Sequence, residues 1–196
     1  MPEPPPNATH PLSPAAWREW LAAHHDRDEG VWMVYYKKAT GKQSLSYDEA
    51  VDEAICFGWI DSQPRKLDAE RSMRYFSPRR AESGWSRVNK ERIERMTAAG
   101  KMTPAGQARI DVAKADGSWS ALDDVENLVV PDDLAAAFEA HPAAAEHWKA
   151  FPRSAKRGIL EWIAGAKRAT TRAKRIDETA RLAAQNIRAN QWPRKG

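Results

Sequence analysis

The sequence predicts an α+β fold: a small, mostly antiparallel sheet packed by helices in the first half, then a C-terminal module of three or four helices. Signals for strands and turns are confined to the first half of the chain. After Phe76, apolar side chains recur only at helical spacing. The 196 residues are 42% hydrophobic and 30% charged, which is typical of a folded globular chain and excludes a disordered one.

The first elements of the chain follow from proline positions and from apolar runs. Residues 1–12 are rich in proline and predict a disordered lead. Ser13 followed by Pro14 is typical of the start of a helix, and apolar residues at helical spacing continue it. Three short apolar and aromatic runs then predict the strands of the sheet, at residues 31–37, 59–61 and 72–76.

Capping residues divide the remainder into helices. Ser46 with Glu49 forms a capping box for a helix that ends at Gly58. Ser86 and Thr103 begin further helices, and several more follow. A change of composition near residues 118–131 indicates a boundary between modules. We therefore expect an α+β module at residues 13–120 and a helical module at residues 121–196.

Charge is distributed unevenly along the chain. The net charge is +4, yet the segment from Arg153 to the end holds 12 Lys and Arg against three Asp and Glu. Residues 111–146 hold nine acidic residues and one lysine. Two interpretations fit: solvated helix faces that attract each other, or contact with nucleic acid or anionic lipid. The last helix lacks the interleaved aromatic residues of single-strand binders, which disfavours nucleic acid.

Several classes of protein are excluded or disfavoured by motif. No apolar run approaches the roughly 18 residues that a membrane-spanning helix needs, and the proline-rich start does not fit a signal peptide. A cytoplasmic location is therefore expected. The five histidines lack metal-ligand spacing, and no nucleotide-binding loop is present, so the sequence indicates neither a metal site nor a cofactor. No Ser-His-Asp or paired-carboxylate arrangement can be assembled, which favours a binding role over an enzyme.

The single cysteine, Cys56, stands near the C-terminal end of a predicted helix. That end of the helix dipole raises the pKa of a thiol, whereas reactive thiolates usually lie at helix N-termini or beside cations. Nearby Arg65, Lys66 or Arg79 could reverse the effect. The sequence favours a buried, unreactive thiol over a nucleophile.

A dense polar and aromatic cluster follows Cys56 and supplies the candidate site. Asp61 and Arg79 each follow a short predicted strand. Ser86 caps the next helix, whose first N–H groups are free and favour an anion. One interpretation is an ion pair that supports the fold. The other is a single concavity that takes a small anionic ligand. The candidate residues are Asp61, Arg79, Trp85, Ser86 and Asn89.

Six ordered motifs resemble the YdeI/OmpD-associated family, also called bacteriocin-protection proteins. They are AICFGWID at 54–61, RYFSPR at 74–79, WSRVN at 85–89, GKMTPAG at 100–106, WIAGAK at 162–167 and TRAKRI at 171–176. The resemblance spans roughly residues 12–191. It implies bacterial origin and a link to stress, bacteriocin or cationic-peptide tolerance, but no settled reaction, cofactor or catalytic residue.

Three functional hypotheses follow. The first is a non-enzymatic cytoplasmic stress or resistance protein, whose acidic stretch could attract a cationic peptide. The second is a small-ligand protein or enzyme built around the candidate site. The third is association with nucleic acid through the basic C-terminal helices. The sequence does not distinguish the ligand, the partner or the oligomeric state.

Overall fold

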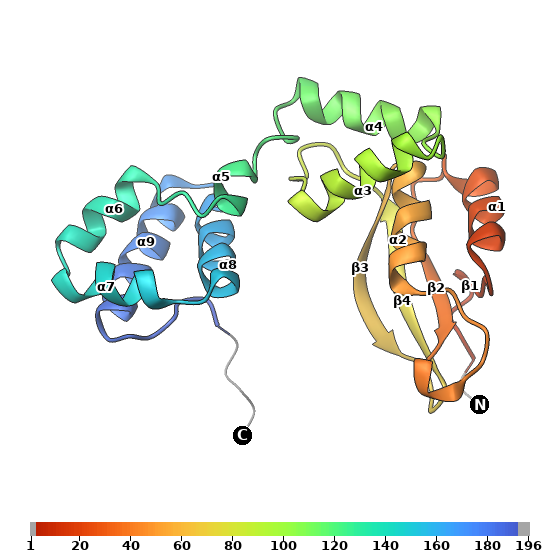
Figure 1. Cartoon of the computed structure of the whole chain (residues 1–196), viewed down its shortest axis with the longest axis horizontal. Helices are drawn as coiled ribbons and strands as arrows, with labels where there is room; N and C mark the ends of the chain where they lie inside the picture. Colours follow the sequence, from red (N-terminus) through yellow and green to blue (C-terminus); the bar gives the residue numbers. More distant parts are fainter. Residues whose placement is uncertain (1–2, 192–196) are drawn as a thin grey trace. The chain divides into compact units, whose positions relative to one another are not determined.

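The computed structural model describes residues 3–191, and the chain divides into two compact units, Met1–Ala121 and Leu122–Gly196. Figure 1 shows the sheet in the first unit and a group of helices in the second. The α+β prediction is confirmed. The division falls one residue after the module boundary that the sequence predicts.

The sheet of the first unit has four strands in the order β1-β2-β4-β3. The strands are β1 (Ala8–Thr9), β2 (Val31–Tyr36), β3 (Trp59–Lys66) and β4 (Arg71–Pro78). β2 and β3 both pair antiparallel to β4, whereas β1 pairs parallel to β2. The sheet is therefore mostly antiparallel, as predicted, and β3 and β4 are longer than expected.

The N-terminal lead differs from the prediction of disorder over residues 1–12. Ala8 and Thr9 form β1 at the edge of the sheet, and the Trp32 N–H donates to the carbonyl of Asn7 at 3.0 Å. Proline is tolerated here because an edge strand leaves one side of its backbone unpaired. The prolines of the lead therefore did not exclude a short strand beside them.

Four helices and a 3-10 turn complete the first unit over its described residues, 3–121. They are α1 (Pro14–His24), η1 (Lys38–Thr40), α2 (Tyr47–Cys56), α3 (Arg87–Ala98) and α4 (Pro104–Ala115). The predicted capping box of Ser46 and Glu49 is present at the start of α2. α1 and α2 bury Trp17, Leu21 and Ile55 with the strand residues Val31 and Phe76 in one core. This core fixes which strand residues face the helices.

The second unit has its own hydrophobic core. Its helices are α5 (Asp123–Glu126), α6 (Asp132–Glu139), α7 (Pro142–Ala150), α8 (Arg153–Ala164) and α9 (Ala169–Ala184). Leu134, Trp148, Ile159 and Ala180 from four of these helices meet in the core. Since α5 is a single turn, residues 122–191 of the unit form four full helices, within the predicted range.

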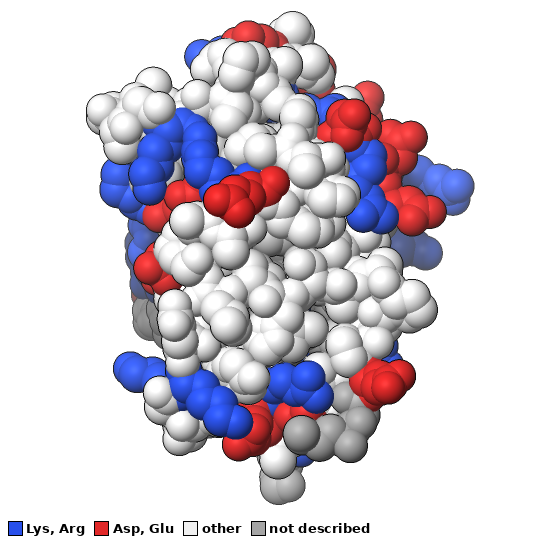
Figure 2. Space-filling model, turned by 90° about the vertical axis from the view of Figure 1, so that its right-hand side faces the viewer, with Lys and Arg blue, Asp and Glu red and all other residues white. Residues whose placement is uncertain are grey.

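Charged side chains of both signs are interspersed on the face shown in Figure 2, around the margin of a broad uncharged area. That face therefore offers no extended basic surface of the kind that nucleic acid binds. Among residues 3–191, no helix is both long and apolar enough to cross a membrane.

Candidate functional site

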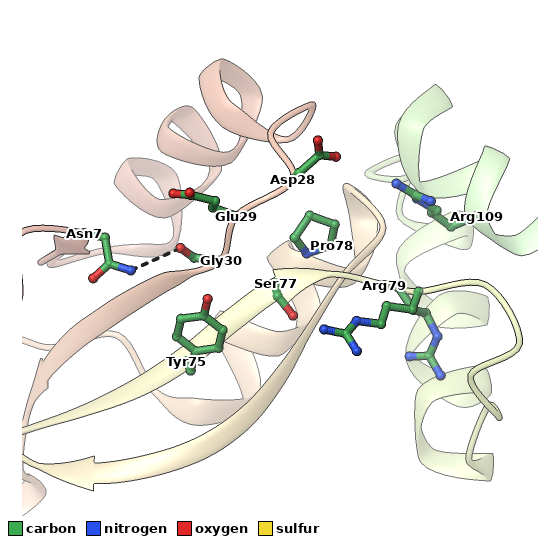
Figure 3. A pocket seen from close by; sticks show the side chains of 10 residues that line it. Asn7, Asp28, Glu29, Gly30, Tyr75, Ser77, Pro78, Arg79 and Arg109 are labelled. Carbon is green, nitrogen blue, oxygen red and sulfur yellow. Dashed lines mark hydrogen bonds between the residues drawn. The ribbon is translucent and has the colours of Figure 1, made fainter.

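A cavity of about 580 Å³ opens in the first unit beside the C-terminal end of β4. Figure 3 shows Arg79 and Arg109 at one end of it and Asn7, Gly30 and Glu29 at the other. Tyr75 of β4 lies beside Gly30, and Ser77 lies between Gly30 and Arg79. The full lining comprises Asn7, Asp28, Glu29, Gly30, Tyr75, Ser77, Pro78, Arg79, Arg80 and Arg109.

Arg79 is the most unusual of these residues because its side chain is only 4% exposed. Its guanidinium carbon lies 3.6 Å from the centre of the Trp85 ring. Its Nη2 donates to the carbonyl of Gly84 at 2.5 Å. Its backbone N–H donates to the carbonyl of Gly58 at 2.9 Å, which fixes the residue at the end of β4. Stacking and hydrogen bonding together hold the guanidinium in one orientation.

The charge of Arg79 has no counterpart in the described part of the chain. Its Nε and Nη1 are buried and have no hydrogen-bond partner, and no carboxylate oxygen lies within 4.0 Å. Burial lowers the pKa of Arg79 to about 10. The group still carries its charge at neutral pH, so a buried cation lines the cavity without a negative partner.

A second buried polar atom lies close to Arg79. The hydroxyl of Ser118 is buried without a partner and lines a small hollow together with Arg79, Trp85 and Arg109. Buried polar groups in folded proteins almost always have a partner. Arg79 and Ser118 thus each bring a buried polar group without a partner to this hollow.

Arg109 reaches the cavity because α4 packs very closely against the end of α2. Gly58 has a φ of 75°, and a Cβ there would lie 2.5 Å from the Arg109 Cγ. A Cβ at Gly106 would lie 2.2 Å from the carbonyl oxygen of Cys56. The Thr103 hydroxyl donates to that same oxygen at 2.6 Å. Two glycines thus allow the approach that brings Arg109 over the backbone.

Gly30 packs tightly against β4 and so fixes the backbone next to Asp28 and Glu29. A Cβ at Gly30 would lie 2.5 Å from both the Tyr75 ring and the Phe76 carbonyl oxygen, so only glycine allows this packing. Gly30 also accepts a hydrogen bond from the Asn7 side chain at 3.5 Å. Asp28 and Glu29 immediately precede it and are exposed at the cavity mouth.

Of the five predicted site residues, the structure brings together only Arg79 and Trp85. Asp61 lies opposite Phe76 in the sheet register, on the face covered by helices, and pairs with Arg74 at 2.7 Å. Ser86 caps α3 by accepting the Asn89 N–H. Of the five, only Arg79 lines the cavity, and Trp85 stacks against it from outside the lining; Asp61, Ser86 and Asn89 lie elsewhere. The expectation that all five line one concavity is therefore corrected, and Asp61 takes part in an ion pair.

Sequence reasoning missed Arg109, Tyr75, Ser77, Asn7 and the acidic pair before Gly30. The signal that could have located Arg109 was the pair of glycines, Gly58 and Gly106, since a glycine inside a helix often marks a close approach. The cap of α3, where the sequence predicted an anion, does not line the cavity beside β4.

Cys56 is fully buried, and its thiol donates to the carbonyl of Asp52 at 3.1 Å. Burial, with a contribution from the charge of Glu53, raises the pKa of the thiol to about 11. The protonated form is favoured because burial penalises a thiolate. The cation that lowers the pKa is Arg18, which the sequence did not indicate, and it does not outweigh burial.

We expect a thiol reagent to label Cys56 slowly in the native protein at pH 7, with a rate that rises about tenfold for each pH unit up to pH 9, because the thiolate fraction keeps growing below a pKa of about 11. The rate of an unperturbed thiol, with a pKa of about 8.5, would be higher at pH 7 and would begin to level off by pH 9. The unfolded chain in denaturant is the control and should react rapidly. Fast stoichiometric labelling of the native protein would contradict a buried, protonated thiol.

Comparison with known families identifies a separate match for each unit. Residues 9–109, just over half of the chain, match the model described as Domain of unknown function (DUF8412), and the chain belongs to that family. Residues 127–186 match the model described as Bacteriocin-protection, YdeI or OmpD-Associated. This second match confirms the resemblance over residues 127–186, which hold the motifs at 162–167 and 171–176. The expected span of 12–191 is corrected, because the four motifs between residues 54 and 106 lie within the first match. Comparison with curated proteins and with solved structures gave no match.

The described residues hold no group of three or more His, Cys, Asp or Glu side chains that could bind a metal ion. Guanidinium groups donate hydrogen bonds to carboxylates and phosphates, and the hydroxyls of Tyr75 and Ser77 add further polar contacts.

Proposed function

We propose that the first unit binds a small anionic ligand in the cavity beside β4. The observation that carries this proposal is Arg79, a buried guanidinium with two donors lacking partners and no carboxylate nearby. Burial of an unpaired charge destabilises a fold. An anion bound in the cavity would supply the missing negative charge and accept the free donors.

The surroundings of Arg79 support an anion over a neutral ligand. Arg80 and Arg109 line the same cavity and add two exposed positive charges. The Trp85 ring holds the Arg79 guanidinium in place, so little conformational entropy is lost when a ligand binds. A purely structural role would need only the stacking and the bond to Gly84, and would leave the remaining donors unexplained.

Arg109→Gln tests the proposal without endangering the core, because Arg109 is exposed. Binding of inorganic phosphate, pyrophosphate and sulfate would be measured by calorimetry and by the shift in the unfolding midpoint. At least one anion should bind the wild type, and Arg109→Gln should weaken it about fivefold, a modest value for a solvated charge-assisted contact.

The matched control is Arg181→Gln, which removes an exposed helical arginine from α9 in the other unit. A chain of net charge +4 attracts anions weakly and without specificity. Equal weakening by both variants would show only that general attraction, and absence of binding by every anion tested would overturn the site.

A role in bacteriocin tolerance or stress is a separate part of the proposal. It is supported by the description of the family model that residues 127–186 match. The anion site lies in the other unit and does not depend on it. The full proposal is a cytoplasmic, non-enzymatic protein with two parts. Its first unit senses a small anion, and its second unit has the role that the matched family description names.

A further inference from the structure

The cavity is lined by charges of both signs. Arg79, Arg80 and Arg109 line it together with Asp28 and Glu29, which form its acidic side. In Figure 3, Glu29 lies away from Arg79 and Arg109, and Asp28 lies between Glu29 and Arg109. Within residues 3–191, no ion pair joins the acidic side to the three arginines. The two carboxylates therefore do not neutralise the three arginines.

Asp28 and Glu29 are available to a ligand. Asp28 forms no ion pair in the described part of the chain. Glu29 has one ion pair, with Arg27 at 3.5 Å, and its side chain is 84% exposed. A long ion pair between exposed groups contributes little energy and is easily exchanged for another partner. Both carboxylates can therefore accept a cation from the cavity.

The segment that carries the two carboxylates is fixed to the sheet. The carbonyl of His25 accepts the indole N–H of Trp59 at 3.1 Å, and Trp59 is almost fully buried. At the other end, Gly30 packs against Tyr75 and Phe76 with no room for a Cβ. Because both ends are anchored, the acidic side is held at a set position relative to Arg79.

We propose that the natural ligand of this cavity is zwitterionic: its anionic group binds Arg79, and an ammonium group a few bonds away binds Asp28 and Glu29. This inference rests on the proposed anion site. A ligand with negative charge alone would be repelled by two carboxylates at the mouth. Amino acids, short peptides with both termini, and aminoalkyl phosphates have the required chemistry.

The test uses two probes that differ in a single group, ethyl phosphate and 2-aminoethyl phosphate. The wild type should bind 2-aminoethyl phosphate about fivefold more tightly, the gain expected from solvated ion pairs with two carboxylates. In the double variant Asp28→Asn/Glu29→Gln the two probes should bind equally. Ethyl phosphate should keep its affinity there or gain slightly, because repulsion is removed.

Asp26→Asn is the matched control, since Asp26 is an exposed carboxylate on the same segment that does not line the cavity. It should leave the fivefold preference intact. Equal binding of the two probes by the wild type would overturn the zwitterion and leave the anion site standing. A preference that survives in the double variant would place the ammonium elsewhere and also overturn it. Binding of neither probe would count against the anion site itself.

Discussion

Arg79→Met is expected to abolish anion binding while leaving the first unit folded. Methionine is unbranched and of similar length, and its sulfur packs well against an aromatic ring such as Trp85. The substitution removes a buried charge whose pKa is already lowered by burial. It also leaves the Gly84 carbonyl without its donor, which costs about 1 kcal/mol. These effects oppose each other, so the free energy of unfolding should change by less than about 1.5 kcal/mol.

The loss of affinity should be much larger. The two free donors of Arg79 would each contribute about 1.5 kcal/mol or more to a charged ligand, which together correspond to at least a hundredfold change. At a ligand concentration of 100 times the dissociation constant, the wild type gains about 2.7 kcal/mol of stability. That gain should be absent from Arg79→Met in denaturant unfolding with and without anion.

Arg92→Met provides a matched control, because Arg92 is also buried, with 7% exposure, but has carboxylate partners. Arg92 pairs with Asp52 at 2.6 Å and also contacts Asp48. Removing it breaks a paired network and should cost about 2 kcal/mol, with anion binding unchanged. Should Arg79→Met cost as much stability as Arg92→Met and leave anion binding intact, Arg79 would be a structural residue.

The fold was largely predictable because its signals are local. The apolar runs of β2 and β4 and the capping box of α2 each lie within a few adjacent residues. Residues 8–9 were missed because two residues form a strand there only through pairing with β2. Such a strand depends on its neighbour and leaves almost no pattern in the sequence.

The site was predictable only in part, because it depends on register and on close approach. Asp61 faces the helices since it pairs with Phe76, and a shift of one residue would have turned it to the other face of the sheet. Arg79 and Trp85 are near in sequence, so their contact could be expected. Arg109 joins them through the packing of α4 on α2, which no short motif encodes.

Gly106→Ala is expected to destabilise the first unit by about 3 kcal/mol, against the usual trend. In a helix interior, glycine to alanine normally stabilises by up to about 1 kcal/mol. Here the new Cβ would lie 2.2 Å from the Cys56 carbonyl oxygen and 2.7 Å from its carbon. These are backbone atoms at the end of α2 and cannot rotate away, so α4 must move, as in overpacked cores.

Movement of α4 has a second consequence for the site. Thr103 donates to the Cys56 oxygen through both its hydroxyl and its backbone N–H, at 2.6 and 3.2 Å, and both bonds weaken if the helix shifts. Arg109 lies on the same helix and packs over Gly58, so it moves away from the cavity. Gly106→Ala should therefore also weaken binding of the anion, at least as much as Arg109→Gln does.

The matched control is Gly158→Ala in α8, where a Cβ would meet nothing within 4 Å. That variant should follow the usual trend and stabilise the second unit slightly. Urea unfolding followed by tryptophan fluorescence compares the two variants, and anion calorimetry gives the second readout. If Gly106→Ala stabilises the protein as Gly158→Ala does and retains full anion affinity, α4 does not pack on the end of α2, and Arg109 does not reach the cavity in the way described above.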